Sequence, residues 1–286
     1  MLQNIQILDI LNLDTMLLDK GIWYKKCHPK IEGVFEAETH DEFFFLEDKS
    51  WWYKLRNKII ESGIKRNPPL DNTIVDVGAG NGFVAAYLEK CGFQTILFEM
   101  GLQGINNAKK RGLNNLVNAP LDKTTVKPNS IPAIGLFDVL EHVENESDFL
   151  CELYAVLKND GMIYISLPAH NFLWSGDDQR AGHFRRYSLK GIRKILEDIG
   201  FGIVYESYFF RYLSLPIFVL RALPYKLFSG RCQTKEFITK TTDFVVPDFV
   251  EKFLSFIYDR DVKKISCSQI SHGASIFITA TKRSSK

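Results

Sequence analysis

Three glycines spaced two residues apart, Gly78, Gly80 and Gly82, constrain the fold of this chain more than any other feature. They follow directly on a β-branched apolar run, and the apolar periodicity of a helix begins at the next residue, Phe83. A strand, a tight glycine turn and a helix together form the ligand site of nucleotide-binding folds, at the edge of a parallel sheet. Because glycine has no Cβ, the backbone N–H groups of such a turn can approach a ligand closely.

The spacing of these glycines argues against a dinucleotide as the ligand. The fingerprint G-x-G-x-x-G would place its third glycine at position 83, which is Phe83 here. Asp76, two residues before the turn, would repel a pyrophosphate, whereas it suits a ligand with a cationic amino group. A nicotinamide-dependent oxidoreductase of the same topology is therefore the disfavoured alternative, and a tight turn that binds nothing is another.

Strand and helix patterns alternate along most of the chain. Ser188 is placed to cap an amphipathic helix, and Gly200 is placed to end it. The alternation predicts an α/β fold with a doubly wound, seven-stranded, mainly parallel sheet, and with a long insert before the last strand. The predicted strands cover residues 73–77, 94–98, 114–117, 133–137, 162–167, 201–205 and 274–280.

Composition excludes several classes of protein. The net charge is +2 over 286 residues, which gives no overall sign of nucleic-acid binding. Five cysteines are scattered without a C-x-x-C pair, so neither a disulfide framework nor a metal site is expected. No signal peptide or apolar run long enough to span a bilayer occurs, and we expect a cytoplasmic protein. From Ser207 onward, however, 13 Lys and Arg face 6 Asp and Glu.

The glycine turn resembles motif I of the class I S-adenosylmethionine-dependent methyltransferases, and later residues extend the resemblance. Glu99 ends the second predicted strand, where a carboxylate can accept hydrogen bonds from both ribose hydroxyls of a nucleoside. The resemblance implies that Met100 flanks the adenine ring. It also implies that Asn118 and Ala119, at the end of the third predicted strand, contact the adenine edge.

Residues 137–143, Phe-Asp-Val-Leu-Glu-His-Val, resemble a motif of the type 11 (UbiE-like) methyltransferases. Residues 51–56, Trp-Trp-Tyr-Lys-Leu-Arg, resemble a helix that covers the cofactor in related enzymes, and an amphipathic core helix is the alternative. The resemblance implies S-adenosylmethionine as cofactor, S-adenosylhomocysteine as product, and a cofactor site made of Tyr53, Arg56, Asp76, Gly78, Ala79, Gly80, Asn81, Gly82, Glu99, Met100, Asn118, Ala119, Phe137, Asp138 and His142.

The segment after the fifth predicted strand carries the candidate acceptor site. Its Leu-Trp-Ser and Gly-His-x-Arg-Arg-Tyr motifs resemble a subgroup of bacterial and archaeal methyltransferases, many of them linked to cell-envelope glycan and lipid genes. His183 is our first candidate for a catalytic base, and Asp177 and Tyr187 are further candidates. The alternative is that acidic side chains pair with arginines and only shape the loop, through Asp177, Asp178, Arg185 and Arg186.

These features predict a methyltransferase that acts on a small-molecule or lipid- or glycan-linked acceptor, at a hydroxyl oxygen. The Asn/Asp-Pro-Pro-aromatic motif of DNA amino-methyltransferases does not follow the fourth predicted strand, and no basic stripe indicates RNA. A non-catalytic protein that keeps the cofactor fold and acts through its C-terminal insert is the alternative function.

The chain is expected to divide into four parts. The first part, residues 1–66, holds an N-terminal extension and the cofactor-covering helix, and residues 67–208 form the cofactor-binding core. Residues 209–270 form the insert, and residues 271–286 form the final strand and tail. The insert begins with an aromatic and apolar run. We expect that run either to cap the sheet as helices or to meet an amphiphilic substrate or the membrane face through residues 209–228.

Overall fold

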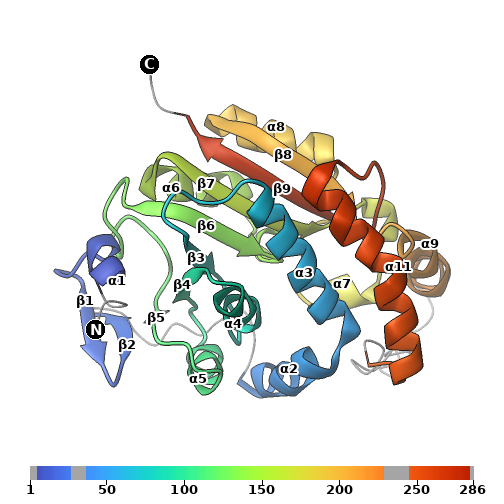
Figure 1. The fold of residues 1–286 in the computed structure, drawn as a ribbon, viewed down its shortest axis with the longest axis horizontal. Helices are drawn as coiled ribbons and strands as arrows, with labels where there is room; N and C mark the ends of the chain where they lie inside the picture. Colours follow the sequence, from blue (N-terminus) through green and yellow to red (C-terminus); the bar gives the residue numbers. More distant parts are fainter. Residues whose placement is uncertain (1–4, 27–36, 229–244, 284–286) are drawn as a thin grey trace.

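The computed structural model describes residues 5–26, 37–228 and 245–283, which build a nine-stranded sheet with helices on both faces (Figure 1). The strand order across the sheet is β1-β2-β5-β4-β3-β6-β7-β9-β8. The strands are β1 Met16–Asp19, β2 Ile22–Lys25, β3 Thr73–Val77, β4 Gln94–Phe98, β5 Leu116–Asn118, β6 Ile131–Phe137, β7 Leu157–Pro168, β8 Phe201–Phe209 and β9 Ser275–Lys282.

The predicted, mainly parallel sheet is confirmed. Strands β5, β4, β3, β6 and β7 run parallel, while β9 lies antiparallel between β7 and β8. The sheet has nine strands rather than the predicted seven, because the hairpin of β1 and β2 extends it beyond β5. An uncovered strand edge leaves backbone groups unpaired, and this hairpin protects the edge of β5. Its two strands have only four residues each, which is too short for a clear sequence pattern.

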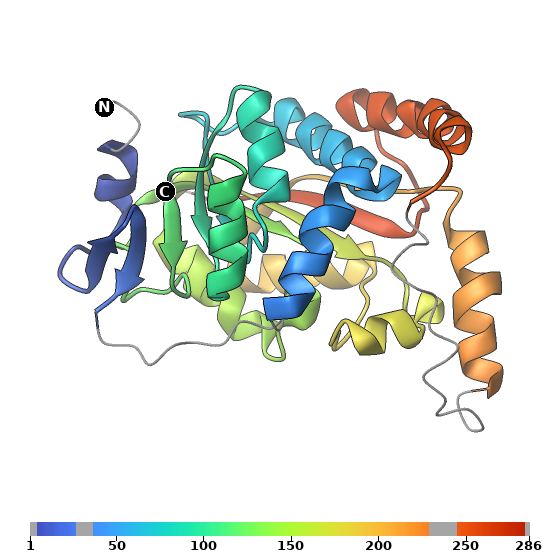
Figure 2. The ribbon, with the colours of Figure 1, turned by 90° about the horizontal axis from the view of Figure 1, so that it is seen from below.

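The helices lie on both sides of the sheet. Figure 2 shows α3, α4 and α11 on one side and α6 and α8 on the other. A 3-10 turn precedes α6, a second precedes α7, and a π-turn joins α9 to α10. The bounds are α1 Ile5–Ile10, α2 Ala37–Lys49, α3 Trp51–Arg66, α4 Phe83–Lys90, α5 Leu102–Lys110, η2 Leu140–His142, α6 Glu146–Val156, η3 Asn171–Leu173, α7 Gly176–Arg180, α8 Leu189–Ile199, α9 Ser214–Ile217, η4 Phe218–Ala222, α10 Leu223–Phe228 and α11 Asp248–Cys267.

Alternate residues of the strands feed two hydrophobic cores. In β3, Val75 and Val77 pack in the core that also holds Leu150 of α6 and Leu196 of α8. Ile74 packs on the opposite face, among residues of α3, α4 and α11. This is the period of two that a β-strand imposes on its side chains. Asp76 shares the face of Ile74, so its carboxylate is directed toward α3 and α4.

Local capping signals predicted the ends of α8 correctly. The hydroxyl oxygen of Ser188 accepts a hydrogen bond from Gly191 N at 3.1 Å, which satisfies a backbone donor of the first turn. Gly200 ends the helix with φ of +115°, a conformation that favours glycine.

The predicted insert contains helices, as one of its two interpretations required. The described parts of it are α9, η4, α10 and α11, and residues 229–244 lie outside the described residues, as do 1–4, 27–36 and 284–286. Within the described ranges, no helix combines the length and the apolarity needed to cross a membrane. The division of the chain at residues 66, 208 and 270 stays a prediction.

Packing around the glycine turn can be tested with Gly82→Ala. A Cβ there would lie 2.6 Å from Leu113 Cδ1 and 2.8 Å from Ala108 Cβ, and φ is +70°. We expect a loss of about 2 to 4 kcal/mol in the free energy of unfolding, from backbone strain and overpacking together. The matched control is Gly112→Ala, where φ is +91° but the space is open. Urea unfolding followed by tryptophan fluorescence would measure both, and equal losses would contradict the packing argument.

Candidate functional site

The parallel strands end at one edge of the sheet, and the predicted cofactor residues gather there. Gly78 follows β3, Glu99 follows β4, Asn118 ends β5 and Asp138 follows β6. In open α/β sheets, ligands bind in the crevice beyond the carboxyl ends of the strands. The fold therefore brings together residues that are far apart in the sequence.

The glycine turn has a backbone that other residues rarely adopt. The φ angle is +68° at Gly78, +54° at Gly80 and +70° at Gly82. Hydrogen bonds from the N–H groups of Gly78 and Ala79 to the carbonyl of Phe98 hold the turn against β4. A Cβ at Gly80 would meet nothing within 4 Å, so the backbone there is open to an approaching ligand.

Glu99 connects the glycine turn to the start of α5. Its Oε2 accepts a hydrogen bond from Gly80 N at 2.8 Å, and its Oε1 accepts one from Gly101 N at 2.7 Å. A carboxylate has about four acceptor positions, so two remain for the hydroxyls of a ribose. The amide of Asn118 donates to the carbonyls of Glu99 and Met100, which ties β5 to the end of β4.

Asp76 is a buried carboxyl group at the end of β3. It is 2% exposed, and its Oδ2 has no hydrogen-bond partner among the described residues. Burial raises the pKa of Asp76 to about 7, and the nearby charge of Glu99 adds to the rise, while Arg56 opposes it. A buried carboxyl group with one oxygen left without a partner favours a cationic ligand group. Together with Glu99 and the open glycine turn, it fits the amino acid end and the ribose of S-adenosylmethionine.

A helix that the sequence did not predict covers this part of the site. In α2, the backbone carbonyl of His40 accepts a hydrogen bond from Asn81 Nδ2 at 2.9 Å. The ring nitrogen Nδ1 of His40 lies 3.3 Å from Asn81 Oδ1. Asn107 donates to the same Oδ1 at 3.1 Å, and Arg111 pairs with Glu47 at 2.9 Å. The side chain of Asn81 is thus directed to α2. No recognised motif marks residues 37–49, so sequence reasoning missed His40.

The helix α3 brings Arg56 to the end of β6. The buried guanidinium forms an ion pair with Asp138, and its Cζ lies 5.3 Å from the ring of Trp52 and 5.4 Å from that of Tyr53. Asp138 has φ of +58°, and its Oδ1 accepts a hydrogen bond from Ser166 at 3.0 Å. One sequence motif singled out Tyr53 and Arg56 and another singled out Asp138, and the structure places the two motifs together.

Two of the predicted cofactor residues are core residues. Ala119 belongs to the core on the α6 and α8 side, and Phe137 belongs to the core on the α3 side. Both side chains are buried in protein contacts. Their contribution to a ligand site would therefore come mainly from their backbone.

Asp178 is the centre of the loop that follows β7. Its side chain is buried, at 1% exposed. The Oδ1 oxygen accepts hydrogen bonds from His183 Nδ1 at 2.9 Å and from Arg186 Nε at 2.7 Å. The Oδ2 oxygen accepts a hydrogen bond from Ser175 N at 2.9 Å. Burial alone would raise the pKa of Asp178, but the His183 hydrogen bond and the Arg186 charge outweigh it and hold the pKa below its ordinary value. With an ionised Asp178 as acceptor, His183 carries hydrogen on Nδ1 and can accept a proton on Nε2.

His183 lies against the motif that follows β6. Its ring meets that of His142 edge to face, with centroids 4.7 Å apart, and Phe184 N donates to the carbonyl of Glu141 at 2.8 Å. Burial lowers the pKa of His142 to about 4, so its imidazole is uncharged at neutral pH, and burial raises the pKa of Glu141 well above its ordinary value. The ligand atoms of Glu141, His142 and His183 lie within 4.8 Å of one another, a spacing that could hold a metal ion.

Asp177, in contrast, points to the insert. It pairs with Arg180 on its own helix and with Arg221 of η4, whose Nη1 lies 3.0 Å from Asp177 Oδ2. The alternative of structural ion pairs therefore holds for Asp177, with different partners from those predicted. For Asp178, the predicted pair with Arg186 coexists with the His183 hydrogen bond.

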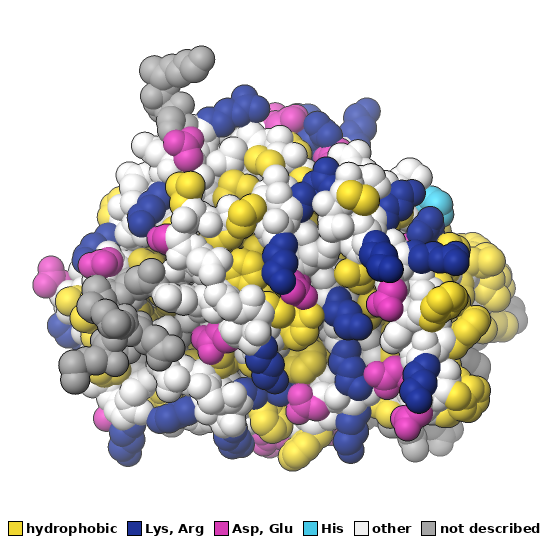
Figure 3. Space-filling model, viewed as in Figure 1, with side chains coloured by type: hydrophobic (Ala, Val, Ile, Leu, Met, Phe, Trp, Pro, Cys, Tyr) yellow, Lys and Arg dark blue, Asp and Glu magenta, His cyan; other side chains and the backbone are white. Residues whose placement is uncertain are grey.

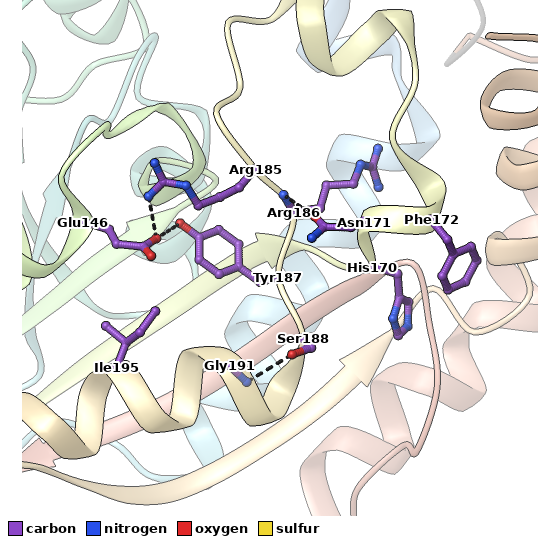
Figure 4. Close-up of a pocket in the computed structure, with 10 residues that line it drawn as sticks. All are labelled: Glu146, His170, Asn171, Phe172, Arg185, Arg186, Tyr187, Ser188, Gly191 and Ile195. Carbon is purple, nitrogen blue, oxygen red and sulfur yellow. Dashed lines mark hydrogen bonds and ion pairs between the residues drawn. The ribbon is translucent and has the colours of Figure 1, made fainter. Parts of the chain in front are cut away.

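A pocket of about 480 Å³ lies beside the same loop, on the side of α8 (Figure 4). Tyr187 stands in its wall, with its hydroxyl bonded to the Leu140 carbonyl at 3.1 Å and to Glu146. Burial raises the pKa of Tyr187, so its hydroxyl stays protonated at neutral pH. The pocket is lined by Glu146, His170, Asn171, Phe172, Arg185, Arg186, Tyr187, Ser188, Gly191 and Ile195.

Comparison with known proteins agrees with this geometry. A sequence model of the methyltransferase-domain family matches residues 51–206, which is more than half of the chain. Two curated relatives are ubiquinone biosynthesis O-methyltransferases. That of Colwellia psychrerythraea is 29% identical over 113 residues, 37% of this chain and 46% of its own length. That of Rickettsia bellii is 27% identical over 135 residues, 41% of this chain and 56% of its own length. The chain thus spans about half the length of the curated relatives it matches.

Solved structures share the fold at low sequence identity. A methyltransferase in complex with a Haloferax volcanii methyltransferase activator is 13% identical, with a TM-score of 0.54 over 87% of this chain and 95% of its own. The Haemonchus contortus phosphoethanolamine N-methyltransferase 2, with S-adenosylhomocysteine bound, is 15% identical, with a TM-score of 0.54 over 91% of this chain and 62% of its own. The family match removes the nicotinamide-dependent alternative. The chain belongs to the class I S-adenosylmethionine-dependent methyltransferases.

Proposed function

We propose that the protein transfers a methyl group from S-adenosylmethionine to a hydroxyl oxygen of a small-molecule or lipid- or glycan-linked acceptor. The observation that carries this proposal is the hydrogen bond between His183 and the buried, ionised Asp178, next to the motif that follows β6. A hydroxyl acceptor needs a base within hydrogen-bond reach, and an oriented imidazole is such a base. The curated relatives, which are named O-methyltransferases, support an oxygen acceptor.

On the cofactor side, we assign the ribose to Glu99 and the amino group to Asp76. The open backbone at Gly80 would let the cofactor approach the glycine turn closely, and Met100 would flank the adenine. The chemistry that S-adenosylmethionine supplies when bound is a methyl group on a positively charged sulfur. The remaining predicted contacts are Tyr53, Arg56, Ala79, Asn81, Asn118, Ala119, Phe137, Asp138 and His142.

The residues of the chain position the acceptor and the cofactor, and they remove the proton from the acceptor hydroxyl. Holding acceptor oxygen and methyl carbon in line, in a site that excludes water, supplies much of the catalysis. His183 Nε2 accepts the hydroxyl proton, while Asp178 keeps the other ring nitrogen oriented and stabilises the imidazolium that forms. Arg186 holds Asp178 in place by the 2.7 Å contact at the same carboxylate oxygen.

The acceptor is proposed to enter from the side of the α7 loop and the pocket beside Tyr187. A lipid-linked acceptor would be met at the cytoplasmic face of a membrane, with residues 209–228 in contact with the lipid. Apolar walls with a few polar groups are typical of small-molecule sites, and this pocket combines Ile195 and Phe172 with Arg185 and Arg186.

Cofactor binding is expected to release a proton from Asp76. Its pKa of about 7 leaves the carboxyl partly protonated at neutral pH, whereas a cationic amino group favours the ionised form. The affinity for S-adenosylhomocysteine should therefore fall below about pH 7, by up to about tenfold per pH unit. Calorimetric titration in buffers of different ionisation enthalpy would measure affinity and proton release together.

The variant Asp76→Asn should bind S-adenosylhomocysteine more weakly and without this pH dependence. The matched control is Asp198→Asn, at an exposed position of α8, which should leave both quantities unchanged. Constant affinity of the unmodified chain between about pH 5.5 and pH 7 would remove Asp76 from the cofactor site.

His183→Ala should lower the rate of methyl transfer about 10²- to 10⁴-fold and leave the affinity for S-adenosylhomocysteine unchanged. His272→Ala, at an exposed histidine before β9, serves as the control and should keep full turnover. Single-turnover rates and calorimetry would separate the two effects. Unchanged turnover in His183→Ala would exclude the proposed base.

The acceptor class can be tested with S-adenosylmethionine that carries a labelled methyl group. The full chain would be incubated with a lipid extract and with lipid-linked glycans, and the labelled product located by mass spectrometry. Label on oxygen supports the proposal, and label on nitrogen or carbon overturns it. Tight cofactor binding without any transfer would favour the non-catalytic alternative.

A further inference from the structure

The two helical parts of the insert expose large apolar side chains at one end of the molecule. Figures 1 and 2 place α9, α10 and the first turns of α11 at that end, and Figure 3 shows hydrophobic side chains gathered there, over α9. Leu220 is 73% exposed and Phe249 is 74% exposed. We name this the insert surface, and it consists of Leu215, Leu220, Leu227 and Phe228 from α9 to α10, and Phe249, Phe253 and Phe256 from α11.

These side chains are not an unfinished part of the core. The inner faces of the same helices already pack against a core that includes Phe210. Ile217 of α9 and Phe218 of η4 contact this core, and so do Leu254 and Ile257 of α11. In α11, positions 249, 253 and 256 recur at helical spacing on the face opposite to buried Tyr258. Exposed apolar stripes of this kind mark interaction sites.

The charges around the insert surface suit an anionic partner. Lys226, Lys252, Arg260 and Lys263 are exposed on these helices. Two of the acidic side chains of α11 are neutralised by α3, because Glu251 pairs with Lys54 at 2.9 Å and Asp259 with Lys58 at 3.9 Å. A helix with leucine and phenylalanine on one face and lysine and arginine beside it is typical of segments that lie in the surface of an anionic bilayer.

The insert surface is also connected to the acceptor loop. Arg221 pairs with Asp177 of α7, the hydroxyl of Tyr225 lies 3.0 Å from Gln179 Oε1, and Lys226 donates to the carbonyl of Phe172 at 2.9 Å. Asp177 and Gln179 are the residues directly before and after Asp178 on α7. A partner that binds the insert surface would therefore lie beside the loop that carries His183.

We propose that the insert surface binds the surface of an anionic lipid bilayer and thereby presents the acceptor loop to molecules held in that bilayer. This inference rests on the proposed function and deepens it, because it specifies an anionic bilayer and a second helix, α11, that takes part in the contact. Apolar side chains supply the free energy of insertion, and the basic side chains select anionic lipid. Because α7 lies between the insert surface and His183, a bilayer bound to the insert surface would hold acceptor molecules near the proposed base.

The test is flotation of the full chain with vesicles of phosphatidylcholine and phosphatidylglycerol, compared with vesicles of phosphatidylcholine alone. The unmodified chain should float with the anionic vesicles. The double variants Leu220→Gln/Leu227→Gln and Phe253→Gln/Phe256→Gln should each lower the partition coefficient at least about tenfold. Arg260→Glu/Lys263→Glu should lower partition into anionic vesicles and remove the preference for them.

The matched control is Leu17→Gln/Leu18→Gln, which removes two exposed leucines from β1 at the opposite end of the molecule. It should float like the unmodified chain, and S-adenosylhomocysteine affinity, measured on every variant, should be unchanged. An unmodified chain that stays in the soluble fraction would overturn the proposal. So would a dimer in light scattering that the same double variants convert to monomer, because the insert surface would then join two copies. Flotation needs no acceptor, so its failure would leave the proposed methyl transfer standing.

Discussion

The carboxylate of Glu99 is the interaction on which the ligand end of this sheet depends. It receives one N–H from the glycine turn after β3 and one from the start of α5, so it fixes two loops with a single side chain. The neighbouring contacts are built on the same loops: Asn118 binds the carbonyl of Glu99, and Asn81 of the glycine turn binds α2. The site is therefore largely preorganised by hydrogen bonds within the chain, and the acceptor positions that remain on Glu99 are already oriented.

Signals that act over a few residues could be predicted from the sequence. The glycines of the turn, the cap at Ser188 and the stop at Gly200 depend on local backbone geometry, and the structure has them where the pattern puts them. The sheet follows from apolar alternation, because each strand must bury one or both faces. The mainly parallel sheet could be predicted from the order of strands and helices along the chain, whereas the antiparallel orientation of β9 was not predicted and comes from the structure.

Contacts between distant segments could not be predicted in this way. Nothing in the spacing of Arg56 and Asp138 shows that they form an ion pair, since 82 positions separate them. The same holds for His40, which reaches the glycine turn from a helix without a recognised motif. The loop after β7 is intermediate: its residues were recognised as one motif, but only the fold shows that Asp178 binds both His183 and Arg186, while Asp177 turns to the insert.

The register of the last two strands has a consequence for the whole insert. Phe209 at the end of β8 pairs directly with Ser275 at the start of β9, so the chain leaves the sheet and returns to it at adjacent positions. Both ends of the intervening segment are thus anchored whatever its length, and the entropy of closing such a loop grows only slowly with the number of residues in it. A connecting segment of a different length could therefore join the same two strands without a change in their pairing.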